Sequence, residues 1–143
     1  MKRIGCVLLV AIVFAGMGAS QKTAESVPVY AIQKPTIIAF FTQMTDKELE
    51  NDPGSNEALS DFQLYNGEVH DPLLKAGIEF READAHSFKI RVGKRIQTFR
   101  TGKIGIGYYF IAPGKKPHVE NGVMTDTDIL DVARKYFGIA IPR

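Results

Sequence analysis

The closing stretch of the chain, from Gly107 to Gly138, constrains the fold more than any other part of the sequence. It opens with Tyr108–Ile111, a short apolar run rich in β-forming residues, which indicates a buried strand. Ala112–Lys115 then predicts a tight turn, because proline fixes φ at the second turn position and glycine accepts a positive φ at the third. We expect His118–Met124 to pair back across this turn as a second strand.

An amphipathic helix is predicted directly after this hairpin. Thr125 suits the N-cap position, and Asp128 stands three residues later, as in a capping box. Gly138 is placed to end the helix. The apolar residues that recur at helical spacing, and so form its expected buried face, are Ile129, Val132, Ala133, Tyr136 and Phe137. A hairpin followed by such a helix is typical of a domain in which helices cover a sheet.

This succession of strand, glycine turn, strand and capped helix resembles the C-terminal third of thioredoxin-like domains. The intervals from Gly114 to Gly122, and from Gly122 through Thr125 to Ile129, match that family's pattern without a gap. The resemblance implies an α/β fold for residues 35–143, a three-layer sandwich with a central mixed sheet. An unrelated α+β domain with the same ending is the alternative.

The first half of this region follows the same pattern more loosely. Pro35–Thr42 is almost continuously apolar, which favours a central strand that is covered on both faces. We expect a loop over Gln43–Asn56 and then a long helix from Glu57 to Ala76, kinked at Pro72 as in thioredoxin-like domains. Ile78–Glu82 is predicted to return as a strand.

The next segment departs from the thioredoxin pattern, because two strands stand where that family has a helix. Phe88–Val92 alternates apolar and basic residues, a Gly93–Lys94 turn follows, and Arg95–Phe99 reads as the returning strand. We therefore expect an inserted β-hairpin in place of a middle helix, with its position relative to the sheet left open. Val27–Ile32 can add an edge strand at best, because Pro28 has no backbone N–H to donate to a neighbouring strand.

The N-terminal segment has the pattern of a secretory signal over residues 1–20. A basic start precedes the apolar run Ile4–Phe14, and small residues fill Gly16–Ser20, which predicts cleavage before Gln21 and export to the periplasm or the exterior. Residues 21–34 are expected to form a linker or N-terminal arm. An uncleaved anchor is the alternative, although the apolar run is shorter than the ~20 residues of a membrane-spanning helix. Cys6 lies too early for lipoprotein attachment.

Cys6 is also the only cysteine of the 143 residues, so the processed chain has no thiol. Thioredoxin-like enzymes carry Cys-x-x-Cys after the first central strand, where this chain has Thr42–Asp46, and a cis-proline where it has Ile106 and Gly107. None of that family's catalytic residues is therefore present, and disulfide exchange is excluded because no thiolate can attack.

No other catalytic or metal-binding pattern stands out. The histidines do not converge with acids at metal-ligand spacing, and no nucleophile elbow, phosphate loop or dinucleotide fingerprint occurs. We accordingly predict no metal and no cofactor. A hydrolase or other enzyme that uses polar residues of the 42–56 loop, or the pair Asp84 and His86, is the alternative.

Charge is strongly segregated along the chain. Asp46–Asp84 contains eleven acids and three bases, whereas Ala85–Val119 contains eight bases and no acid. Without residues 1–20 the chain has 16 basic and 16 acidic residues, which disfavours nucleic-acid binding. The candidate residues for binding an anionic protein or polymer of the cell envelope are Lys89, Arg91, Lys94, Arg95, Arg100 and Lys103. The alternative is that this basic hairpin lies against the protein's own acidic helix.

Together these features predict an exported, redox-inactive thioredoxin-like domain that works as a binding or scaffolding module. No stable membrane span is expected after signal cleavage. A structural subunit that pairs through an edge strand is a further alternative. The sequence does not indicate an oligomeric state.

Overall fold

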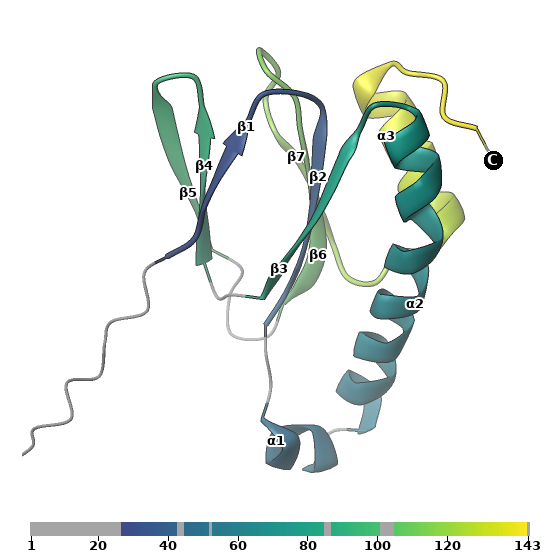
Figure 1. Ribbon diagram of the computed structural model, residues 1–143. Coiled ribbons are helices and arrows are strands. Elements are labelled where there is room, and N and C mark those ends of the chain that lie inside the picture. The colour runs from purple at the N-terminus through teal and green to yellow at the C-terminus, as the bar shows by residue number, and fades with distance from the viewer. Residues whose placement is uncertain (1–26, 43–44, 52, 85–86, 101–104, 143) are drawn as a thin grey trace, which may run out of the picture.

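The fold is α/β, with two mixed sheets and a layer of helices (Figure 1). The computed structural model describes residues 27–42, 45–51, 53–84, 87–100 and 105–142. In Figure 1 the small sheet stands at the left, the larger sheet in the middle, and the two long helices at the right. The predicted signal segment, residues 1–20, lies outside the described residues.

The larger sheet contains four strands in the order β3–β2–β6–β7. They are β2 (Thr36–Phe41), β3 (Glu79–Asp84), β6 (Ile106–Ile111) and β7 (His118–Asn121). β2 is parallel to β3 and antiparallel to β6, and β6 is antiparallel to β7. The first five residues of β2 are buried, which confirms the predicted central strand covered on both faces.

Successive residues of β2 face opposite sides, because side chains alternate along a strand. Ile37 and Ala39 belong to the core shared with the helices, whereas Ile38 and Phe40 belong to the core shared with the small sheet. The described residues therefore form two hydrophobic cores, one on each face of the four-stranded sheet.

Two helices cover one face of this sheet, α2 (Pro53–Lys75) and α3 (Asp126–Phe137). Their buried residues in the shared core are Phe62, Val69, Leu73, Ile129, Leu130 and Ala133. The helix α2 continues through Pro72, and the next turn is closed by the Ala76 amide donating to the Pro72 carbonyl over 3.1 Å.

The predicted loop over Gln43–Asn56 is wrong for most of its length. A short helix, α1, spans Asp46–Asn51, and α2 already begins at Pro53. Proline is well accommodated at the first position of a helix, because its missing N–H has no intrahelical acceptor there. Pro53 therefore starts a helix within the predicted loop.

The small sheet has the order β1–β4–β5 and lies on the face of the larger sheet opposite the helices. Its strands are β1 (Val29–Ile32), β4 (Ser87–Val92) and β5 (Arg95–Arg100). The predicted hairpin is confirmed, with Gly93 at φ 60 in its two-residue turn. β1 pairs in parallel with β4 as an edge strand. The hairpin thus forms a separate layer and does not extend the central sheet.

The hairpin that precedes the last helix is also confirmed. Lys115 donates its backbone N–H to the Ala112 carbonyl over 3.2 Å, and Gly114 has φ 81, as the glycine position of the turn requires. The returning strand β7 is shorter than predicted, since it ends at Asn121 before Gly122 at φ 101.

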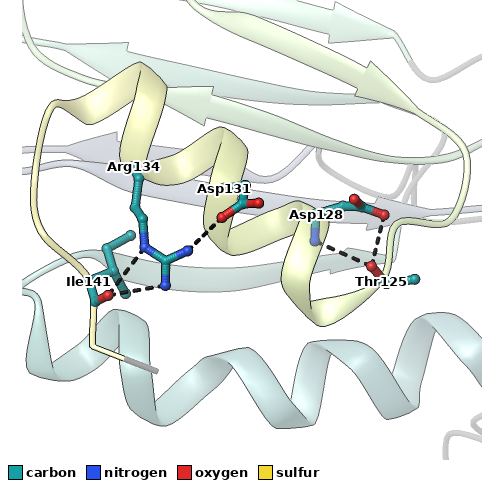
Figure 2. A network of polar contacts seen from close by, with 5 residues as sticks. All are labelled: Thr125, Asp128, Asp131, Arg134 and Ile141. Atoms are coloured by element: carbon teal, nitrogen blue, oxygen red, sulfur yellow. Dashed lines mark hydrogen bonds and ion pairs between the residues drawn. The ribbon is translucent and has the colours of Figure 1, made fainter.

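The predicted boundaries of α3 are confirmed. The Thr125 hydroxyl accepts from the Asp128 backbone N–H over 3.2 Å and donates to the Asp128 carboxylate over 2.8 Å (Figure 2). At the other end, Gly138 adopts φ 69 and donates its N–H to the Arg134 carbonyl over 2.9 Å.

The side chain of Arg134 connects α3 to the C-terminal tail (Figure 2). Its Nε and Nη2 donate to the Ile141 carbonyl over 3.2 and 3.1 Å, and Nη1 donates to Asp131 over 2.6 Å. The Ile141 side chain is buried in the helix-side core. The arginine therefore holds the tail where this side chain closes the core.

Candidate functional site

The basic residues of the predicted site lie on the small sheet. Phe88 and Ile90 are buried against the larger sheet, so the intervening Lys89 and Arg91 point to the outside. Lys94 and Arg95 are exposed at the turn between β4 and β5. The structure therefore brings four of the six predicted residues to one sheet. The side chain of Arg100 and all of Lys103 lie outside the described residues.

Apolar side chains share the outward face with these bases. Val29 pairs with Lys89 across β1 and β4, and Ile96 pairs with Arg91 across β4 and β5. The residues Val29 and Ile96 are 47% and 54% exposed, which is high for large aliphatic residues. We call the outward side of the small sheet, with the hairpin end, the basic sheet face. Val29, Lys89, Arg91 and Ile96 lie on the outward side, and Lys94 and Arg95 lie at the hairpin end, where Arg95 is paired with the inward-facing Val92.

The acidic helix α2 does not neutralise this face. The helix α2 packs on one face of the four-stranded sheet and the small sheet packs on the other face. The four-stranded sheet therefore lies between α2 and the basic sheet face. Among the described residues, no ion pair joins an acid to any basic side chain of the basic sheet face. The alternative in which the basic hairpin lies against the protein's own acidic helix is therefore wrong.

A second basic surface was not singled out from the sequence. It is a groove of about 500 Å³ between the β6–β7 turn and the end of α3. We call it the basic groove, and it is lined by Lys115, Lys116, His118, Glu120, Val132, Lys135 and Tyr136. The sequence contained one sign of this groove, the pair Lys115–Lys116 in the basic part of the chain. The third lysine of the groove, Lys135 of α3, lies about twenty residues later, so the sequence did not show that the three come together.

Tyr136 organises the walls of this groove. Its backbone carbonyl accepts from Lys115 Nζ over 2.8 Å, and the same ammonium group lies 5.5 Å from the centre of its ring. Its hydroxyl donates to the Lys116 carbonyl over 3.0 Å. Burial raises the pKa of the Tyr136 phenol above its usual value. The helix end and the turn are thus connected by two hydrogen bonds.

The ring of His118 forms another part of the wall. It stacks on Tyr136 with a centroid distance of 6.1 Å and an interplanar angle of 24°. The Nε2 atom of His118 lies 2.8 Å from the carboxylate of Glu120. Among the described residues that line the groove, Glu120 is the one acid, and it is therefore already engaged.

Residues of the 42–56 segment, on which the alternative enzyme hypothesis depends, line a smaller hollow of about 250 Å³ at the end of β2. Its lining is mainly apolar, with Thr42 and Ser55 as its polar side chains, and contains no ionisable residue among those described. The Thr42 hydroxyl accepts from the Gly105 amide over 3.3 Å, a contact that fixes the strand end. The described residues that line this hollow therefore include no ionisable side chain to act as a general acid or base.

The other candidate pair cannot be assembled from the described residues. Asp84 is exposed at the end of β3, and His86 lies outside the described residues. No group of three or more histidine, cysteine, aspartate or glutamate side chains within the described part of the chain is arranged to hold a metal ion. Within the same residues, none of the helices has the length and apolar character needed to cross a bilayer.

Comparisons with known proteins give no relative from which a function could be transferred. No protein-family model, curated protein or solved structure matches the chain. The two basic surfaces are thus the features from which a function has to be argued.

Proposed function

We propose that this protein is an exported, redox-inactive binding module of thioredoxin-like topology, and that it holds an anionic partner on its basic sheet face. One observation carries the proposal: the small sheet stands apart from the acidic helix, so its outward bases have no acid of the described chain to pair with. Lys89 and Arg91 on this face, with Lys94 and Arg95 at its hairpin end, produce a positive potential that attracts an anionic surface.

The order of the elements supports the thioredoxin-like topology. The strands β2 and β3 are parallel and are connected through α2, while β6 and β7 form an antiparallel hairpin that leads into α3. The place of the family's cysteines is taken by Thr42 and the residues that follow it. Such a domain keeps a scaffold without its thiol chemistry, which favours binding over catalysis.

The composition of the face indicates the kind of partner. Val29 and Ile96 lie next to Lys89 and Arg91 in the strand register, so an apolar contact and a charge contact are available side by side. Mixed surfaces of this kind suit a carboxylate-rich protein or polymer, because apolar burial contributes affinity while the charges increase the association rate.

One edge of the small sheet, the strand β5, gives evidence against the structural-subunit alternative. β5 is an edge strand that begins with Arg95 and ends with Arg100. Charged residues on an edge strand oppose pairing with another strand. We therefore place binding on the face and not on the β5 edge.

The test uses the chain without residues 1–20 and fluorescent poly-L-glutamate as the anionic probe. Changing Lys89, Arg91, Lys94 and Arg95 to glutamine should weaken binding about tenfold or more, because the attraction is electrostatic. The matched control changes the exposed residues Lys34, Lys47 and Lys75 to glutamine, which removes positive charge outside both basic surfaces and should leave binding close to wild type.

Salt and stability provide the accompanying measurements. Wild-type binding should weaken as salt rises from about 50 to about 500 mM, since the screening length is ~10 Å at 0.1 M and shorter above it. Urea melts of the sheet-face variant should show unchanged or slightly higher stability, because like charges are removed. Equal weakening in the sheet-face and control variants, or binding that does not change with salt, would contradict the proposal.

Export and redox inactivity are tested separately. The intact mass of the protein from its native host should correspond to a chain that starts near Gln21, and a mass that retains Met1 or Cys6 would overturn export. The processed protein should not accelerate the reduction of insulin by dithiothreitol above the buffer rate, since it contains no cysteine.

A further inference from the structure

We infer that the basic groove is a binding site for a small organic anion, a carboxylate or phosphate attached to a flat apolar body. The site is distinct from the basic sheet face: it is formed by the β6–β7 turn, β7 and the end of α3. The inference is therefore independent of the proposed function.

The charges of the groove leave a positive excess. Lys115, Lys116 and Lys135 all line it, and within the described part of the chain Glu120 is the one acid that does so. Among the described residues, no ion pair or hydrogen bond engages the ammonium groups of Lys116 and Lys135. An anion between them would replace the repulsion of like charges with attraction.

The shape of the groove adds an apolar platform to this charge. The stacked rings of His118 and Tyr136 provide flat surface, and Val132 lies beside them on α3. The phenyl ring of Phe110 supports both rings from the core side, at centroid distances of 5.9 and 6.3 Å. A volume of about 500 Å³ falls within the ~300–1,000 Å³ of small-molecule sites.

The groove is also held in its shape without a ligand. Lys115 is bonded through Nζ to the Tyr136 carbonyl, and the Tyr136 hydroxyl is bonded to the Lys116 carbonyl. These two contacts cross from the turn to the helix, so the walls do not have to be ordered on binding. Preorganisation of this kind lowers the entropic cost of association.

Calorimetric titration of the chain without residues 1–20 tests the inference with four probes. Phenyl phosphate and benzoate should bind, whereas benzyl alcohol, which lacks the charge, and benzylamine, which carries the opposite charge, should not. Inorganic phosphate should bind about tenfold or more weakly than phenyl phosphate, because it makes no contact with the ring platform. The two anions distinguish a phosphate site from a carboxylate site.

The double variant Lys116→Gln/Lys135→Gln should lose about tenfold or more in affinity for the anion that binds. Lys34→Gln/Lys75→Gln removes the same charge outside the groove and should bind as wild type does. The sheet-face quadruple variant should also bind normally, which separates this site from the proposed function. Equal loss in the two double variants, equal binding of benzyl alcohol, or no binding of either aromatic anion at millimolar concentration would overturn the inference.

A second measurement does not depend on the folding of any variant. In amide chemical-shift maps of the wild-type protein, the binding anion should move signals of residues 115–120 and 132–136. Movement confined to other parts of the molecule would equally overturn the site.

Discussion

Gly107 and Phe40 face each other across β6 and β2, and the glycine backbone lies directly against the phenylalanine ring. A Cβ atom at Gly107 would stand 2.7 Å from Cζ of Phe40 and would also collide with the backbone oxygen of Glu120. The ring of Phe40 is packed in turn against Phe88 and Tyr109 between the two sheets. Neither neighbour can move away freely, so any side chain at this position costs stability.

The first prediction follows from this contact. Gly107→Ala should lower the free energy of unfolding by about 1–3 kcal/mol, because the added methyl group forces the strand or the Phe40 ring to shift. Urea melts measure the effect. The control is Gly67→Ala in α2, where nothing lies within 4 Å of the added atom. There we expect a gain of up to about 1 kcal/mol from better helix propensity.

If Gly107→Ala proved as stable as the wild-type protein, the close approach of β2, β6 and β7 described here would be wrong. A loss of stability in Gly67→Ala would contradict the open surface of α2 at that position.

The elements of the fold were largely predictable because their signals are local. The hairpin of β4 and β5, the Pro113–Gly114 turn and both ends of α3 all depend on residues within a few positions of one another. The layer to which the β4–β5 hairpin belongs depends instead on its parallel pairing with β1, more than fifty residues earlier. No local pattern records such a pairing, so its position could not be derived.

The same distinction applies to the candidate sites. The bases on β4 and β5 follow from strand alternation, but whether they meet the acidic helix depends on which face of the larger sheet the hairpin covers. The basic groove needs Lys115 and Lys135 to be brought together by the packing of α3 on the sheet. Sequence reasoning identified the first set of residues and missed the second for this reason.

The second prediction compares the cap of α3 with its buried face. Thr125→Ala removes the acceptor of the Asp128 amide and should lower stability by about 1 kcal/mol. Ile129→Ala opens a cavity at a fully buried position and should lower it by about 2–5 kcal/mol. Urea melts in which Thr125→Ala were the more harmful change would contradict the burial of this helix face.

The third prediction concerns the C-terminal tail. Arg134→Gln removes the guanidinium group that donates twice to the Ile141 carbonyl, so stability should fall by about 1–2 kcal/mol. Hydrogen exchange should become faster over residues 139–142. Asp131→Asn is the matched control, because it weakens only the exposed ion pair with Arg134 and should change stability by about 0–1 kcal/mol. Unchanged exchange in Arg134→Gln would show that the tail is held by Ile141 packing alone.

The last prediction concerns alkaline pH and Tyr108, whose side chain is 0% exposed beneath α2. Burial raises the pKa of the Tyr108 phenol well above its ordinary value of 10.0, and the nearby Glu82 carboxylate raises it further. The Met124 backbone lies near the hydroxyl, which tends to lower that pKa, yet no described group meets it in hydrogen-bond geometry.

The sign of the pH effect follows from this raised pKa. Below about pH 10 the phenol is neutral in both states, so the contribution of its burial is fully present. Above that pH the unfolded chain releases the proton while the folded chain keeps it, and stability falls as pH rises towards the folded-state pKa.

Tyr108→Phe cannot ionise and should lose less stability than the wild-type protein between pH values of about 9 and 11.5 in urea melts. At neutral pH the same variant should be about as stable as the wild type or slightly more so, because it removes a buried hydroxyl without a partner. Parallel losses of stability in the two proteins over this pH range would mean that Tyr108 ionises as easily in the folded state as in the unfolded chain, and hence that it is not buried.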